Sequence, residues 1–125
     1  MPINECDILV IDDSPGIRTF LNVSFGEEGA RIHEAPNADM AIALFKSIRP
    51  DLVILDLGLP DRDGLDLLPD LCAEGNGHCP PIIVLSVRND TYSRTKAIER
   101  GASAYVTKPF MVEELYDSIE DVLKQ

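Results

Sequence analysis

Uninterrupted apolar runs, each ended by a polar residue, recur along the chain. Residues 8–11, 52–55 and 82–85 each consist of four consecutive Ile, Val or Leu residues, and residues 105–107 form a weaker run. Such continuous runs are typical of strands buried on both faces, as in a parallel sheet covered by helices. A less apolar segment at residues 30–34 predicts a further short strand, at an edge of the sheet.

Helical periodicity and capping residues occupy the segments between the strands. Ser14 followed by Pro15, and later Asn37, are suited to helix N-termini. The third helix contains Pro69, which is expected to shorten or kink its first turns. The fourth, near residues 91–100, has a poor apolar face and is expected to be the least firmly docked. The fifth, at residues 112–123, is strongly amphipathic.

This alternation predicts an α/β fold with a single domain over residues 1–125. Five strands would form a parallel sheet in the order 2-1-3-4-5, joined by right-handed crossovers, with five helices on both faces. In that order the topological switch point, where ligands bind in such folds, lies between the first and third strands.

Composition and charge exclude several classes of protein. Apolar residues make up 45% of the 125 residues, which suffices for one core. The 22 acidic and 11 basic residues give a net charge of −11, which argues against direct nucleic-acid binding through clustered Lys and Arg. No run approaches the roughly 20 apolar residues of a membrane span, and the N-terminus does not resemble a signal peptide. A cytoplasmic protein is expected.

The chain contains three cysteines. Cys6, Cys72 and Cys79 are expected to be free thiols, because their number is odd and their spacing irregular. Cys72, His78 and Cys79 could form half of a zinc site, but no fourth ligand is evident and an ordinary loop is favoured. His33 alternates with apolar neighbours and is interpreted as structural.

Acidic residues follow the two strands that flank the switch point. Asp12 and Asp13 come directly after the first strand and Asp56 after the third. Like charges 4 Å apart repel by about 4 kcal/mol at an effective dielectric of 20, so a shared proton or a bound cation is expected. Mg²⁺ fits best, because it prefers hard oxygen ligands and retains water and phosphate oxygens.

A hydroxyl and an ammonium group are expected at the same edge, because Ser86 ends the fourth strand and Lys108 follows the fifth. A carboxylate, a cation and a lysine around one point can support formation of an aspartyl phosphate. Asp56, alone at the end of the central strand, is the better nucleophile, and the adjacent Asp12 and Asp13 are the better metal ligands. A single aspartate after a strand is usually a cap or turn residue, but the whole set at four strand ends argues against coincidence.

Together these residues resemble the receiver domain of response regulators in two-component signalling. The resemblance covers residue 8 to about residue 123. Residues 55–61 and 82–86 are most similar to receivers of the winged-helix transcription-factor class. The resemblance depends on the spacing of Asp12-Asp13, Asp56, Ser86 and Lys108-Pro109, with Leu59-Pro60-Asp61, Asp63-Gly64 and Tyr105.

The resemblance implies an acceptor and a metal site. Asp56 would accept a phosphoryl group from a histidine kinase or a phosphotransfer protein. Asp12, Asp13 and Asp56, with the backbone carbonyl of Gly58, would hold Mg²⁺. The protein would be a signalling switch rather than an enzyme, although it takes part in its own phosphoryl transfer.

The resemblance also implies a switch. Ser86 and Lys108 would contact the phosphoryl group, and the Lys108–Pro109 peptide bond would be cis. Ser86 would move towards the phosphoryl group, and Tyr105 would turn into the space it leaves. The surface of the fourth helix, fifth strand and fifth helix would then change for a downstream effector domain or protein.

Three departures from the family pattern carry expectations of their own. Val87 stands where the family usually has a small residue, and we expect it to narrow access to the site. Gly58 and Arg88 occupy positions that tune the aspartyl-phosphate lifetime, and neither offers a carboxylate or amide to orient water. Slow self-dephosphorylation is therefore predicted, and loss within seconds would contradict it. Residues 103–104 (Ser-Ala) replace an Asp-Asp pair that serves dimerisation in the winged-helix class, so a phosphorylation-dependent homodimer stays open.

Two alternatives remain beside the signalling switch. One is a receiver-like interaction module that takes no phosphate. The other is a small Mg²⁺-dependent phosphatase or a flavin carrier, although no second acid near Asp56 supplies a general acid, and Asp12-Asp13 would repel a flavin phosphate. Both a stand-alone regulator and a fragment of a longer protein are compatible with the sequence.

Overall fold

Strands and helices alternate along the whole structure, a computed structural model that describes residues 3–75, 77 and 79–124. The strands are β1 (Asp7–Ile11), β2 (Arg31–Ala35), β3 (Leu52–Leu55), β4 (Ile82–Ser86) and β5 (Ala104–Thr107). The helices are α1 (Pro15–Glu27), α2 (Ala38–Ile48), α3 (Gly64–Glu74), α4 (Thr91–Glu99) and α5 (Val112–Leu123).

The five strands form one parallel sheet in the order β2-β1-β3-β4-β5, which confirms the predicted α/β fold and strand order. Every residue of β3 and β4 is buried, as the continuous apolar runs predicted. The edge strand β2 begins one residue later than expected and buries only its last residue fully. The central strands therefore supply a rigid base for the residues that follow them.

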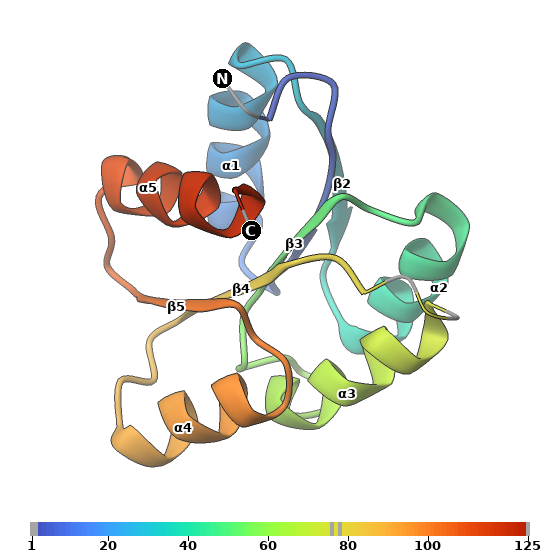
Figure 1. Cartoon of the computed structure of the whole chain (residues 1–125), viewed down its shortest axis with the longest axis vertical. Helices are drawn as coiled ribbons and strands as arrows, with labels where there is room; N and C mark the ends of the chain where they lie inside the picture. The colour runs from blue at the N-terminus through green and yellow to red at the C-terminus, as the bar shows by residue number, and fades with distance from the viewer. Residues whose placement is uncertain (1–2, 76, 78, 125) are drawn as a thin grey trace.

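Helices cover both faces of the sheet (Figure 1). On one face, α1 and α5 contribute Leu21, Phe25 and Ile119 to a buried cluster. On the other, α2, α3 and α4 contribute a second cluster that includes Phe45 and Leu67. Three of the buried polar side chains, Asp12, Asp56 and Ser86, lie instead at the edge of the sheet where the strands end.

Pro69 lies inside α3 and does not shorten it, so that part of the sequence expectation is wrong, while the kink stays a prediction. The helix runs from Gly64 to Glu74. A proline has no N–H to donate to the carbonyl four residues earlier, which here belongs to Leu65. That carbonyl instead accepts a hydrogen bond of 3.0 Å from the Arg100 guanidinium. A side chain from the end of α4 thus satisfies the group that the proline leaves unbonded.

The helix α4 has the poor apolar face that the sequence indicated. It buries only Ser93 and Ala97, both small, whereas α1 on the other face of the sheet buries Leu21 and Phe25. Weak apolar burial lowers the free energy needed for local displacement. The looser attachment of α4 remains a prediction.

The expectation of free thiols is wrong for two of the three cysteines. Cys72, in the last turn of α3, forms a disulfide with Cys79, and their Cα atoms lie 4.9 Å apart. Sequence spacing alone does not show that the chain after α3 returns so close to the helix. The disulfide also contradicts the zinc alternative for these two sulfurs, and His78 lies outside the described residues.

The structural interpretation of His33 agrees with its place on β2. Its Nε2 atom lies 3.0 Å from Oδ1 of Asp7 on the neighbouring strand β1. Hydrogen bonds from Arg31, then from His33, lower the pKa of that carboxyl to about 2. These three side chains join β1 to β2. They lie at the edge of the sheet opposite to the one where β1 ends.

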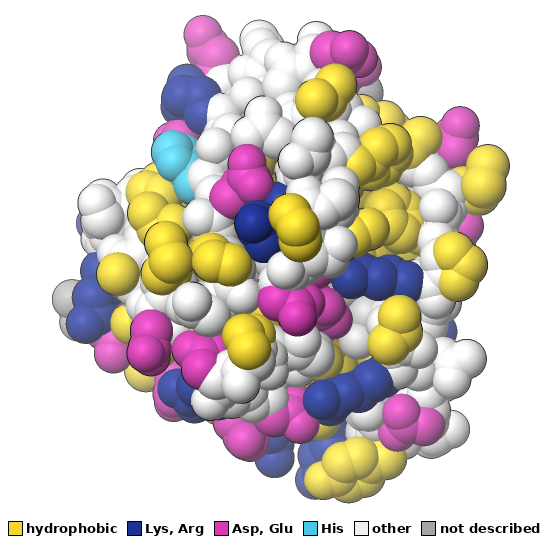
Figure 2. Space-filling model, turned by 180° about the vertical axis from the view of Figure 1, so that it is seen from behind, with side chains coloured by type: hydrophobic (Ala, Val, Ile, Leu, Met, Phe, Trp, Pro, Cys, Tyr) yellow, Lys and Arg dark blue, Asp and Glu magenta, His cyan; other side chains and the backbone are white. Residues whose placement is uncertain are grey.

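Charge is mixed on the molecular surface. Figure 2 shows one face of the molecule, on which acidic and basic side chains are interspersed among apolar groups. That the domain does not bind nucleic acid directly stays a prediction from the net charge of −11. Among the helices of the described residues, none has the length and apolar character required to cross a membrane.

Candidate functional site

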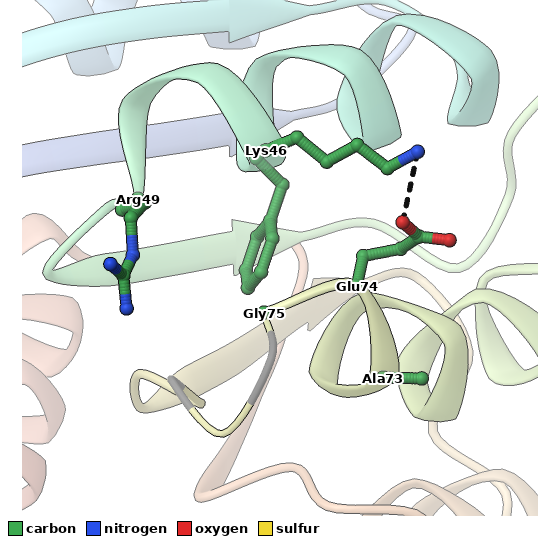
Figure 3. Close-up of a pocket in the computed structure, with 6 residues that line it drawn as sticks. Lys46, Arg49, Ala73, Glu74 and Gly75 are labelled. Atoms are coloured by element: carbon green, nitrogen blue, oxygen red, sulfur yellow. Dashed lines mark ion pairs between the residues drawn. The ribbon is translucent and has the colours of Figure 1, made fainter.

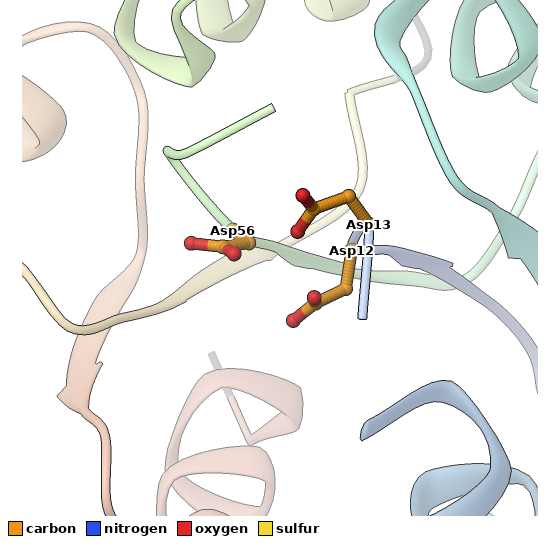
Figure 4. Close-up of side chains that lie close together, drawn as sticks. All are labelled: Asp12, Asp13 and Asp56. Atoms are coloured by element: carbon orange, nitrogen blue, oxygen red, sulfur yellow. The ribbon is translucent and has the colours of Figure 1, made fainter. Parts of the chain in front are cut away.

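Three carboxylates meet where β1 and β3 end (Figure 4). β1 and β3 are neighbours in register, with Ile11 opposite Leu55, so Asp12 and Asp56 leave the sheet side by side. One oxygen from each of Asp12, Asp13 and Asp56 lies within 4.8 Å of the others. The predicted cluster of residues distant in the chain is therefore present.

Burial makes the charges of this cluster costly. Asp12 is 2% and Asp56 7% exposed, whereas Asp13 faces solvent. Burial raises the pKa of the Asp12 carboxyl above its ordinary value, although hydrogen bonds from Lys108 and the Ser14 N–H oppose the rise. A buried carboxylate of this kind is stabilised by any cation that reaches it.

Lys108 supplies one such cation from the end of β5. Its Nζ atom donates to Oδ2 of Asp12 at 2.7 Å and to Oδ2 of Asp56 at 3.3 Å. Burial alone would lower the pKa of the ammonium, but its hydrogen bond to Asp12 and the two carboxylate charges raise it above the ordinary value. Lys108 is therefore charged at neutral pH and ties the ends of three strands together. The Lys108–Pro109 peptide bond is cis, as the resemblance implied.

Ser86 and Tyr105 come from the neighbouring strands β4 and β5. Ser86 is buried, and its Oγ atom accepts a hydrogen bond of 3.3 Å from the Arg88 N–H. The Tyr105 hydroxyl donates to the Arg88 carbonyl at 2.6 Å, and the Arg94 guanidinium lies 4.8 Å from the centre of the Tyr105 ring. Both predicted switch residues are thus bonded to the loop between β4 and α4.

Gly58 begins the loop that follows Asp56. Its N–H donates to Oδ1 of Asp56 at 3.2 Å, which orients the carboxylate. The role of its carbonyl as a metal ligand stays a prediction. Val87 is 71% exposed beside Ser86 at the rim of the site.

Three contacts of the site were not predicted. The Ser14 N–H donates to Oδ1 of Asp12 at 2.9 Å, which the capping role of Ser14 could have suggested. The Arg18 guanidinium donates to the Asp12 carbonyl at 2.8 Å, and Arg88 is paired with Asp63 at 3.1 Å. Nothing in the sequence pattern indicates the last two, because both join residues through side-chain reach rather than strand position.

A divalent cation fits the donor set. Carboxylate oxygens from two strand ends converge on one side of Lys108, and Mg²⁺ takes oxygen ligands together with water. Asp12, Asp13 and Asp56 are the residues that would hold it. Such an ion would offset the repulsion among three carboxylates that a single lysine cannot balance.

The protein should therefore be stabilised by Mg²⁺. Ten times the dissociation constant of the ion corresponds to about 1.4 kcal/mol of added stability, measured as a rise in melting temperature. Asp13→Asn should remove most of that gain and, because it relieves like-charge repulsion, should make the protein more stable than wild type in EDTA. An unchanged melting temperature at millimolar Mg²⁺ would count against the metal site.

Comparison with known proteins identifies the family of the chain. The family model of the response regulator receiver domain matches residues 8–120. The chain is a member of this receiver family. As a receiver domain of two-component systems, it is a phosphorylation-dependent signalling switch.

Curated relatives of the receiver domain are response regulators. The KDP operon transcriptional regulatory protein KdpE of Escherichia coli K12 is 34% identical over 119 residues, which are 95% of this chain and 52% of that protein. The transcriptional regulatory protein KdpE of Mycobacterium tuberculosis H37Rv is 40% identical over 107 residues, 86% of this chain and 46% of the relative. The chain therefore spans about half the length of the curated relatives it matches.

Solved structures show the same receiver fold. A two-component response regulator from Clostridium difficile superposes with a TM-score of 0.90 at 28% identity, covering 97% of this chain and 98% of the other. The beryllofluoride-activated N-terminal receiver domain of RstA from Klebsiella pneumoniae gives a TM-score of 0.84 at 28% identity, with coverage of 95% and 99%.

A separate hollow of about 500 Å³ lies where α2 and α3 end, at the edge of the sheet opposite to the carboxylates. Figure 3 shows the residues that line it, including Lys46, Arg49 and Glu74. Lys46 and Glu74 form an ion pair of 2.9 Å. Among the described residues, its lining holds a single carboxylate, Glu74, which is already paired with Lys46, so we assign the hollow no part in the receiver chemistry.

Proposed function

We propose that this receiver domain accepts a phosphoryl group on Asp56, with Mg²⁺, from a histidine kinase or phosphotransfer protein. The observation that carries the proposal is the convergence of Asp12, Asp13 and Asp56 within 4.8 Å, with Lys108 Nζ bonded to two of them. Asp56 is the acceptor because it lies at the end of the central strand and the Gly58 N–H orients its carboxylate.

The phosphoryl transfer is a displacement at phosphorus. A carboxylate oxygen of Asp56 forms a bond to phosphorus while the phosphorus–nitrogen bond of the donor phosphohistidine breaks, and the imidazole leaves with its electron pair. A bound Mg²⁺ would neutralise charge on the phosphoryl oxygens. Lys108 would contribute a second positive charge there, and the Ser86 hydroxyl a hydrogen-bond donor.

Phosphorylation is proposed to act through Ser86 and Tyr105. A hydroxyl that turns towards the phosphoryl group leaves the Arg88 N–H, and a ring that turns inward leaves the Arg88 carbonyl. The weakly buried helix α4 follows the loop that carries Arg88, so the surface of α4, β5 and α5 would change. A downstream effector domain or protein would read this change.

We propose that the phosphodonor docks on an apolar hollow of the receiver domain beside the site. A hollow of about 500 Å³ is lined by residues of α1 and of the loops after β4 and β5, namely Ile17, Phe20, Val87, Lys108, Pro109 and Phe110. Phe20 is 45% exposed although it lies on α1, and it packs edge-on against Phe110. Because Lys108 also borders the carboxylates, a helix of the donor docked here would bring its phosphohistidine to Asp56.

The wider setting of the domain is part of the same proposal. Since the matched relatives are about twice as long as this chain, we infer that the receiver works with an effector, for which transcriptional regulation is the output suggested by their names. We propose that it acts in the cytoplasm as a switch without turnover of a separate substrate. The residues 1–125 would form one receiver domain, and a phosphorylation-dependent homodimer stays a prediction.

Beryllofluoride tests the proposal against an interaction module that takes no phosphate. With Mg²⁺ present, this phosphoryl analogue should raise the melting temperature beyond the effect of Mg²⁺ alone, because it adds contacts to Lys108 and Ser86. Fluoride without beryllium serves as the control. An identical melting temperature with and without beryllofluoride would favour the non-phosphorylated module.

Slow self-dephosphorylation is part of the proposal, because of the residues at positions 58 and 88. Gly58 has no side chain, and Arg88 carries neither a carboxylate nor an amide, so neither position orients an attacking water. The lifetime of the aspartyl phosphate stays a prediction, to be followed by mass spectrometry after removal of the donor.

A further inference from the structure

Arg88 is the residue through which several parts of the receiver site are connected. Its Nη1 atom donates to both carboxylate oxygens of Asp63, at 3.1 Å each. Its N–H donates to Ser86 Oγ at 3.3 Å, and its carbonyl accepts from the Tyr105 hydroxyl at 2.6 Å. One ion pair therefore holds a residue to which both switch residues are bonded.

Asp63 is itself firmly anchored. It is the N-cap of α3, where its Oδ1 atom accepts from the Leu65 N–H at 2.9 Å. Its backbone forms an isolated antiparallel bridge with Gly58, two residues after Asp56. The carboxylate is thus fixed relative to the end of β3, and the ion pair ties the loop after β4 to the loop that carries Asp56.

This tie opposes the movement expected on phosphorylation. If Ser86 turns towards Asp56 and Tyr105 turns inward, the backbone of Arg88 loses both of these hydrogen bonds and the loop is free to shift. The ion pair with Asp63, by contrast, holds the Arg88 side chain at the N-terminus of α3. The contact with Asp63 therefore belongs to the conformation before activation.

We propose that Asp63 is a positioning residue that acts through Arg88 to restrain the β4–α4 loop and so weakens binding of the phosphoryl group at Asp56. The proposal rests on the proposed function, since it concerns the regulation of the same site. It gives Asp63 a part beyond its capping of α3.

The substitution Asp63→Asn separates the capping of α3 from the ion pair with Arg88. An asparagine caps a helix about as well as an aspartate, but it removes the charge that holds Arg88. A partly exposed ion pair is a modest restraint, so its loss should tighten beryllofluoride binding in Mg²⁺ by about two- to fivefold, measured by isothermal titration calorimetry. The matched control is Asp66→Asn, which removes the same charge three residues away and breaks the comparable Arg100–Asp66 pair of 3.1 Å. That control should leave the affinity unchanged.

A double-mutant cycle excludes a general electrostatic effect. In an Arg88→Gln background, Asp63→Asn should add nothing, because its partner is gone. Arg88→Lys, which keeps the charge, should return the affinity towards the wild-type value. These readouts would not respond to a purely structural role of Asp63.

The outcomes that overturn the inference are distinct from those that overturn the function. If wild type binds beryllofluoride and Asp63→Asn behaves as Asp66→Asn does, or if the full effect persists in the Arg88→Gln background, the positioning role is wrong while the proposed function stands. If wild type itself fails to bind beryllofluoride in Mg²⁺, the proposed function and the inference fall together.

Discussion

Asp56→Asn is expected to abolish phosphorylation while leaving the fold intact. The asparagine oxygen can still accept from the Gly58 N–H, and Lys108 keeps its shorter contact of 2.7 Å with Asp12. The variant lacks the carboxylate oxygen that attacks phosphorus, so incubation with Mg²⁺ and acetyl phosphate should give no phosphoprotein by mass spectrometry. Its thermal stability in EDTA should equal or exceed that of wild type, because one of three crowded charges is gone.

Two results would contradict this expectation. Phosphoprotein that persists in Asp56→Asn would mean that the acceptor is another residue. A variant that fails to fold would show that Asp56 is needed for the structure. Circular dichroism and the melting curve distinguish the two cases.

Gly64→Ala is expected to damage both the fold and the site. A Cβ atom at Gly64 would lie 2.6 Å from Leu57 Cα and 2.8 Å from the Asp56 carbonyl oxygen. Both neighbours are backbone of the segment that carries the acceptor, so the methyl group cannot be accommodated by rotating a side chain. Overpacking of this kind costs about 1–3 kcal/mol, measured by urea unfolding, and should also shift Asp56 enough to reduce phosphorylation.

Gly26→Ala is the matched control for this substitution. Gly26 lies in the last turn of α1, and nothing is within 4 Å of the position of its Cβ. Alanine there should stabilise the protein by about 0.5–1 kcal/mol. If the two variants behaved alike, the close approach of Gly64 to the acceptor segment would have no consequence, and the account of this turn would be wrong.

The sheet could be predicted because its signal is local and strong. Runs such as residues 52–55 are buried along their whole length, and several such runs alternating with helical segments are typical of a parallel sheet covered on both faces. The edge strand β2 was placed less accurately, since it buries only its last residue fully. The effect of Pro69 was misjudged because its compensation comes from Arg100, which is distant in the sequence.

The core of the site could be predicted for the same topological reason. Asp12, Asp56, Ser86 and Lys108 come together because each ends or follows a strand, and parallel strands end at one edge. The contacts that depend on side-chain reach could not be predicted, such as the pair between Arg88 and Asp63, which are 25 residues apart. The Cys72–Cys79 disulfide was missed in the same way, because the return of the chain after α3 leaves no periodic signal.

Chemical trapping of the phosphorylated residue tests the central claim most directly. The protein is incubated with Mg²⁺ and acetyl phosphate, the acyl phosphate is reduced with borohydride, and peptide mass spectrometry locates the modified residue. We expect a single modified position, Asp56, with no modification when EDTA replaces Mg²⁺. Modification at a different residue, or an unmodified protein in Mg²⁺ under conditions where another receiver domain is labelled, would contradict the account.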